Sequence, residues 1–74
     1  MTRTVRDLAV GERAVLAEPE VGGDQRRRLA ELGLRPGQEI VLAQRAVGGA
    51  RVVSVHGSRI ALDGRTAAAL RVQP

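Results

Sequence analysis

The chain has no phenylalanine, tyrosine or tryptophan among its 74 residues, and this absence constrains the fold more than any other feature. One aromatic side chain buries about 150–250 Å², so a core without aromatics must be assembled from small pieces. Those pieces are 10 valines, 8 leucines, 2 isoleucines and 11 alanines. Branched aliphatic residues favour strands, and a domain of this length buries only about 60% of its unfolded surface. The sequence therefore predicts a compact β architecture with no deep, enclosed catalytic pocket.

The chain contains no cysteine, which excludes disulfides, a thiolate nucleophile and zinc sites of the cysteine type. No apolar run of signal-peptide length follows Met1, and no stretch approaches the roughly 18 apolar residues of a membrane span. We therefore expect a cytoplasmic protein that does not insert into the membrane.

The net charge is +4, carried by 12 arginines and no lysine against 8 acidic residues. A basic balance is typical of nucleic-acid-binding proteins. The acidic residues are interspersed along the chain, however, and no aromatic ring is present to stack on bases. The pattern favours a solvated surface of mixed charge over stable nucleic-acid binding. Nucleic-acid binding is kept as the alternative function.

Glycine and proline divide the chain into short segments at the spacing of a small barrel. Strands are expected over residues 12–17, 39–45, 51–56, 59–62 and 70–72. Their alternation places three pairs of side chains on buried faces: Ile40 with Leu42, Val53 with Val55, and Ile60 with Leu62. The last strand would then close the sheet against the first.

One helix is well defined, over residues 25–32. Asp24 precedes it and can accept hydrogen bonds from the free amides of the first turn. No glycine, proline or β-branched residue interrupts the segment, and Leu29 and Leu32 lie three residues apart on one face. We expect both leucines to be structural.

Gly33 follows the last helical turn, at a position where many helices end on a left-handed residue. Leu34 should then fold back onto Leu29, as in a Schellman-type ending, and Pro36 cannot continue the helix. Because Pro36 and Gly37 are adjacent, a tight turn is expected over residues 34–37.

These segments predict a mainly β fold, a small SH3-like barrel of about five strands with one helix inserted after the first, formed by residues 1–74 as a single domain. Gly57 and Ser58 predict a two-residue hairpin turn of type II′, and a short helical turn is expected over residues 66–69. A closed barrel also avoids unpaired sheet edges. A mixed α+β sandwich is the structural alternative.

The sequence contains no recognisable catalytic set. His56 is the single histidine, and no Asp or Glu lies in its strand to orient the imidazole towards Ser54. The carboxylates are scattered without paired-histidine or EF-hand spacing. Gly22 and Gly23 precede the helix but lack the lysine and hydroxyl residue of a phosphate loop. We therefore expect no enzymatic activity, no metal site and no cofactor.

Arg26, Arg27 and Arg28 form the most conspicuous charge run. Successive helical residues fan out by about 100°, so the three side chains cannot share one direction. Two interpretations stay open. The run is either a docking face for an acidic partner, nucleic acid or a phosphate group, or a solvated helix side on which Arg27 pairs with Glu31.

Over residues 8–72 the chain resembles the FeoA family of small ferrous-iron-transport accessory proteins. The strongest likeness is the segment from Arg28 to Gly37, which reads RLAELGLRPG and matches the family pattern R-L-x-x-L-G-L-x-P-G. The segments Leu8-x-x-Gly11 and Leu70-x-Val72 add support. The same domain resembles the C-terminal SH3-like module of metal-dependent repressors, so a regulatory module of that origin is a further alternative.

The resemblance implies a non-enzymatic adaptor of bacterial ferrous iron uptake that binds and regulates the cytosolic G-protein domain of a FeoB-like membrane transporter, without carrying iron. We expect the docking surface to be the helix and its exit turn, formed by Arg26, Arg27, Leu34, Arg35 and Pro36. The structural residues of the same motif are Asp24, Leu29, Leu32, Gly33 and Gly37. Formation of homo-oligomers is left open.

Overall fold

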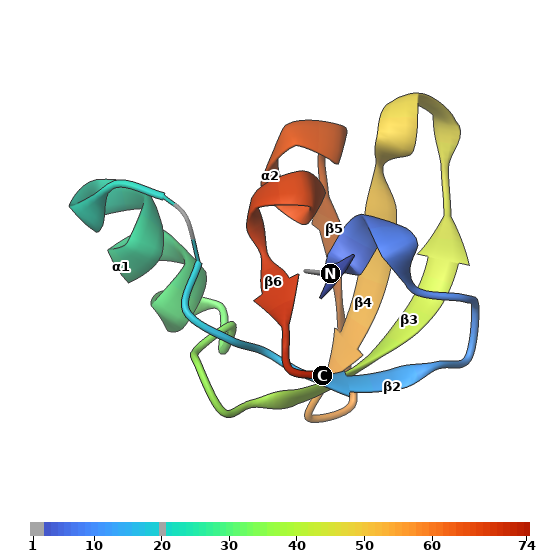
Figure 1. The fold of residues 1–74 in the computed structure, drawn as a ribbon, viewed down its shortest axis with the longest axis horizontal. Coiled ribbons are helices and arrows are strands. Elements are labelled where there is room, and N and C mark those ends of the chain that lie inside the picture. Colours follow the sequence, from blue (N-terminus) through green and yellow to red (C-terminus); the bar gives the residue numbers. More distant parts are fainter. Residues whose placement is uncertain (1–2, 20) are drawn as a thin grey trace.

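The computed structural model describes residues 3–19 and 21–74 (Figure 1). Within these ranges, short strands alternate with two α-helices and two 3-10 helices. In chain order the elements are β1 (Arg3–Thr4), η1 (Val5–Asp7), β2 (Arg13–Val15), α1 (Gly23–Glu31), β3 (Glu39–Arg45), η2 (Val47–Gly49), β4 (Arg51–Val55), β5 (Ser58–Leu62), α2 (Gly64–Ala69) and β6 (Arg71–Val72).

The strands form two antiparallel sheets that are joined at one point. The larger sheet has the order β2-β3-β4-β5, and β1 pairs with β6 in a two-stranded sheet. A bridge between Leu16 and Val72 connects the two. Beside it, the Ala17 N–H donates to the Arg71 carbonyl at 2.8 Å. The last strand therefore lies against the first predicted strand, as expected, and also against β1, a strand that the sequence pattern does not predict.

This is the small β-rich, SH3-like fold that the sequence predicts, with a longer second helix. Strand β3 has the expected bounds, whereas β4 ends one residue early, at Val55. The expected helical turn over residues 66–69 is a full helix, α2, because Asp63 caps it and accepts a hydrogen bond from the Thr66 amide at 2.7 Å.

The core is made of aliphatic side chains alone. Its buried members are Val5, Leu8, Leu16, Leu29, Leu34, Ile40, Leu42, Val53, Val55, Leu62, Ala67, Leu70 and Val72. The predicted alternation is confirmed in β3 and β4, where both members of each pair are buried. In β5 only Leu62 is buried, and Ile60 packs against the core from a partly exposed position.

The β4–β5 hairpin turn differs from the predicted one. Val55 pairs with Ser58, so the turn residues are His56 and Gly57, and not Gly57 and Ser58. Both turn residues have positive φ, 50° for His56 and 79° for Gly57. Positive φ at both positions defines a type I′ turn, which matches the twist of the flanking strands. The predicted type II′ turn was therefore wrong in type, and its position was wrong by one residue.

The carboxyl end of α1 has the predicted Schellman geometry. Gly33 is left-handed with φ of 92°. Its N–H donates to the Ala30 carbonyl at 2.9 Å, and the Leu34 N–H donates to the Leu29 carbonyl at 2.9 Å. These two bonds satisfy carbonyls that would otherwise be left free at the helix end.

The amino end of α1 differs from the prediction for Asp24. The helix begins at Gly23, and the preceding Gly22 is the capping residue, without a side-chain hydrogen bond. Asp24 lies inside the first turn, where a negative charge is still favourable beside the free amides. The helix begins two residues earlier than predicted because Gly23, which has no side chain to restrict its backbone, accepts helical angles.

Arg51 is a buried charged side chain, only 7% exposed, that joins the start of β4 to η1. Its guanidinium donates to the Ala50 carbonyl at 2.8 Å and to the Arg6 carbonyl at 3.0 Å. Burial and the neighbouring charges of Arg45 and Arg6 lower the pKa of Arg51. The side chain thus stabilises the packing of η1 through backbone acceptors.

We predict that Gly33→Ala lowers the free energy of unfolding by about 1–2 kcal/mol, the cost of a left-handed residue that carries a Cβ atom. The added Cβ would meet Val55 Cγ1 at an ordinary 3.5 Å, so backbone strain and not crowding causes the loss. Urea unfolding followed by far-ultraviolet circular dichroism measures it. Gly23→Ala is the matched control, because Gly23 lies in the same helix with open space around it and should gain up to about 1 kcal/mol. Equal effects at both sites would contradict the assigned helix ending.

Candidate functional site

Helix α1 lies to one side of the sheet (Figure 1). Its arginines are exposed. Arg26, Arg27 and Arg28 are all exposed, as both interpretations of the charge run require. Arg26 forms an ion pair with Glu18, with 2.7 Å between Nη1 and Oε1. The pair between Arg27 and Glu31, which belongs to the solvated-side interpretation, is not formed among the described residues. The helix therefore presents a basic outer side.

Two leucines of the motif have the opposite exposure to the one predicted for them. Leu34, expected on the docking surface, is only 3% exposed and belongs to the core. Leu32, expected to be structural, is 49% exposed. The left-handed residue between them is the physical reason, because it reverses the chain and turns Leu34 back under the helix. The Schellman contact between Leu34 and Leu29 already carried this signal in the sequence.

The exit turn behaves as a tight turn, shifted by one residue. The Gln38 N–H donates to the Arg35 carbonyl at 3.0 Å, which closes a turn over residues 35–38 and not over 34–37. Pro36 and Gly37 occupy its centre, and Gly37 has φ of 88°, as a type II turn requires. The Gly37 N–H also donates to the Leu16 carbonyl at 2.8 Å. Arg35 and Pro36 are thereby held at the surface, exposed as predicted.

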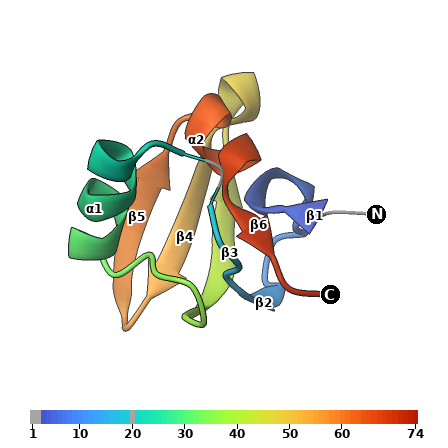
Figure 2. The ribbon, with the colours of Figure 1, turned by 60° about the vertical axis from the view of Figure 1, so that its left-hand side comes forward.

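A groove of about 430 Å³ lies between α1 and the corner formed by β5 and α2. Figure 2 shows the ribbons of these three elements. It is lined by Asp24, Gln25, Arg28, Leu29, Leu32, Ala61, Leu62, Asp63 and Thr66. At one end, Gln25 Nε2 donates to Thr66 Oγ1 at 3.5 Å and links the two helices. The sequence does not predict this groove, because its two walls are far apart in the chain and no local pattern shows that they meet.

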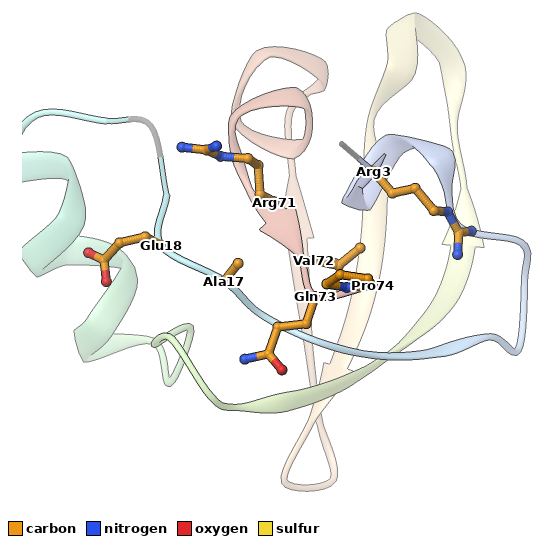
Figure 3. A pocket seen from close by; sticks show the side chains of 7 residues that line it. All are labelled: Arg3, Ala17, Glu18, Arg71, Val72, Gln73 and Pro74. Carbon is orange, nitrogen blue, oxygen red and sulfur yellow. The ribbon is translucent and has the colours of Figure 1, made fainter. Parts of the chain in front are cut away.

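A second hollow, of similar size, lies beside the C-terminal strand. Figure 3 shows its lining, which is Arg3, Ala17, Glu18, Arg71, Val72, Gln73 and Pro74. Its charged groups do not converge on one point. Arg3 points away and pairs with Glu12 at 2.9 Å, while Glu18 pairs with Arg26. The hollow has no set of groups aimed at a reacting atom, as catalysis would need.

His56 is a turn residue with a local partner. Its Nε2 lies 3.0 Å from Oε1 of Gln38, and the side chain is exposed. Among residues 3–19 and 21–74, no group of three His, Cys, Asp or Glu side chains gathers in a way that could hold a metal ion. The described residues therefore offer neither a charge-relay set around His56 nor a preformed metal centre.

Three carboxylates are held in their charged form by local hydrogen bonds. The Thr4 backbone amide donates to Asp7 at 2.8 Å and lowers the pKa of Asp7. The Arg3 guanidinium lowers the pKa of Glu12, and the Thr66 backbone amide lowers the pKa of Asp63. Each carboxylate therefore stabilises a helix end or a loop, and none is poised to donate a proton near neutral pH.

A comparison with protein families matches residues 3–74 to the FeoA domain. The chain belongs to the FeoA domain family. FeoA domains are accessory domains without enzymatic activity, and they are associated with ferrous iron transport. The expectation of a non-enzymatic protein is confirmed on this ground.

Solved structures of FeoA proteins share the whole fold. An iron uptake regulatory protein, FeoA, superposes with a TM-score of 0.87 at 25% identity, over 99% of this chain and 97% of that one. FeoA of Stenotrophomonas maltophilia, solved with zinc and described as a procaryotic SH3 domain protein, gives a TM-score of 0.76 at 28% identity. That match covers 96% of this chain and 89% of the other.

The fold also occurs inside a larger regulator. A manganese-dependent transcriptional repressor gives a TM-score of 0.82 at 19% identity, over 96% of this FeoA chain and 40% of that chain. This likeness shows a common fold alone. A search of the curated proteins found no match. None of the helices in the described part of the chain is long and apolar enough to span a membrane.

We predict that stability falls at acid pH. Because the folded-state pKa values of Asp7, Glu12 and Asp63 lie below their unfolded values, their contribution is complete above about pH 4–5 and is lost as pH falls through the lowered folded pKa values. Melting temperatures recorded by circular dichroism from pH 7 to pH 2 measure this loss. The triple variant Asp7→Asn, Glu12→Gln, Asp63→Asn should show a flatter profile, and an unchanged acid limb in that variant would contradict the assignment.

Proposed function

We propose that this FeoA domain is a cytoplasmic adaptor that binds the cytosolic, GTP-binding region of a FeoB-like ferrous iron transporter and regulates it. Membership of the FeoA family supports the transport context. The description of the Stenotrophomonas maltophilia relative as possibly a ferrous iron transport activating factor agrees with a regulatory role. The absence of converging catalytic groups in the described residues suits a protein that acts by binding.

The basic outer side of α1 is the observation that supports the proposed docking surface. Arg26 and Arg27 lie on the helix, and Arg35 and Pro36 lie on its exit turn, all of them exposed. Leu32 replaces the buried Leu34 as the apolar member of this surface, because it is a large hydrophobic side chain left half exposed. Exposed guanidinium groups suit an acidic patch on the partner, to which Leu32 can add an apolar contact.

The proposed surface, formed by Arg26, Arg27, Leu32, Arg35 and Pro36, offers groups that bind and no group that reacts. Guanidinium groups bind carboxylates through paired hydrogen bonds and keep their charge at all physiological pH values. Such contacts at a rim mainly control the association rate and its salt dependence. Regulation would then follow from occupancy of the transporter's cytosolic region, with no chemical step on the FeoA side.

We predict that the double variant Arg27→Glu, Arg35→Glu weakens binding to the purified cytosolic region of the transporter about ten-fold or more, equivalent to about 1.4 kcal/mol. Isothermal titration calorimetry with and without guanine nucleotide measures the dissociation constant. The double variant Arg13→Glu, Arg45→Glu is the matched control, because it changes the net charge equally at exposed residues of β2 and β3. Equal losses in both variants would assign the effect to net charge, and no binding by the unmodified chain would overturn the proposed function.

A nucleic-acid partner is tested in the same series. A phosphate-driven binder loses affinity steeply as salt rises. Binding of mixed DNA or RNA with such a slope, together with no binding to the transporter region, would favour the nucleic-acid alternative instead.

A further inference from the structure

Strand β5 is the terminal strand of the larger sheet, since the order is β2-β3-β4-β5. Val55 and Ser58 flank the two-residue turn, so they exchange both hydrogen bonds of the closing pair. Hydrogen-bonded and non-hydrogen-bonded pairs alternate from there along the hairpin. Arg59 and Ala61 consequently belong to non-hydrogen-bonded pairs, and their backbone N–H and C=O groups point away from β4 towards the open edge.

Nothing in the described residues covers these groups. The backbone hydrogen bonds outside regular helices and strands include none to Arg59 or Ala61. Both residues are exposed. An unpaired row of backbone donors and acceptors is a template for another strand, and natural sheets usually cover or blunt such an edge.

The open edge borders the groove beside α1. Ala61 and Leu62 form one wall of that groove, and Leu29 and Leu32 form part of the other. Neighbouring strands lie about 4.8 Å apart, so a strand added to β5 would enter the space in front of the helix. One face of such a strand would then contact Leu32, which is 49% exposed.

We propose that the edge of β5 binds an extended segment of the partner protein by strand addition, with main-chain hydrogen bonds to Arg59 and Ala61 and an apolar side chain against Leu32. This rests on the proposed function, in which the partner is the cytosolic region of the transporter. Strand addition takes its affinity from the backbone, and pockets for alternate side chains give specificity.

The charges on the two walls define the chemistry of the segment. Arg28 lines the groove and Arg59 lies on the outer face of β5, so acidic side chains suit the positions next to them. The acidic Asp63 is engaged as the cap of α2, and Asp24 lies near the end that Gln25 and Thr66 close. A second copy of this chain is disfavoured as the occupant, because each copy has a net charge of +4. The segment is therefore expected to alternate apolar and acidic residues.

The test is amide hydrogen exchange of the full chain, alone and with the purified cytosolic region of the transporter. We expect the amides of Arg59 and Ala61 to exchange at least about ten-fold more slowly in the complex, since their opening then requires breaking main-chain bonds. The amide of Ile60, which belongs to a hydrogen-bonded pair with Val53, is the internal control and should be protected in both states.

A variant pair separates backbone pairing from side-chain contact. Ala61→Pro removes an outward N–H and leaves the hydrogen bonds between β5 and β4 intact. Edge strands accept proline at such a position. The variant should weaken binding about ten-fold. Ala61→Ser keeps that N–H with a side chain only one oxygen atom larger, so it should weaken binding far less than Ala61→Pro. Far-ultraviolet circular dichroism checks that both variants fold, and the exchange measurement on the unmodified chain does not depend on either.

The outcomes are distinguishable. No binding of the transporter region by the unmodified chain overturns the proposed function and this inference together. Binding with unchanged exchange at Arg59 and Ala61 overturns strand addition alone and leaves the adaptor proposal intact. If both amides are protected without the partner, and the protection increases with protein concentration, a second copy of the chain occupies the edge. That result would also overturn strand addition by the partner.

Discussion

The left-handed turn at Gly33 is the constraint on which the arrangement around α1 depends. The chain reverses there, so the Leu34 amide closes the helix on the Leu29 carbonyl and the Leu34 side chain enters the core. Leu32, just before the reversal, stays half exposed. Because the helix buries little more than Leu29, it lies beside the sheet and leaves a groove along β5. The surface proposed for partner binding is thus a consequence of how the helix ends.

The charges of the molecule follow a simple division. Carboxylates hold structure locally, as Asp63 does at the start of α2 and Asp7 does at η1. Most arginines remain on the surface. The buried Arg51 donates from Nη1 and Nη2 to backbone carbonyls, while its Nε has no hydrogen-bond partner among the described residues. The described carboxylates do not gather into a group that could hold a metal ion. This FeoA domain therefore exposes guanidinium groups to solvent, and its family is non-enzymatic.

Local patterns predicted those features whose causes are local. Strand β3 was predicted with its observed bounds because alternation and flanking turn residues coincide there, and the glycine-ended helix was predicted because the Schellman signal is short. The hairpin turn was misplaced because His56 adopts a left-handed conformation that a non-glycine residue rarely takes. Strand β1 was missed because its two residues gain their pairing only from β6, at the other end of the chain.

The sequence by itself determined that the core is aliphatic, that the fold is a small β-rich one with a glycine-ended helix, and that the FeoA motif is present. Only the tertiary structure decided which leucine of that motif is exposed, where α1 lies relative to β5, and which backbone groups of β5 face the open edge. The physical reason is that composition and periodicity act over neighbouring residues, whereas exposure depends on which distant segments pack together. Leu32 and Ala61 line one groove because the fold brings them together, and no spacing in the sequence predicts that arrangement.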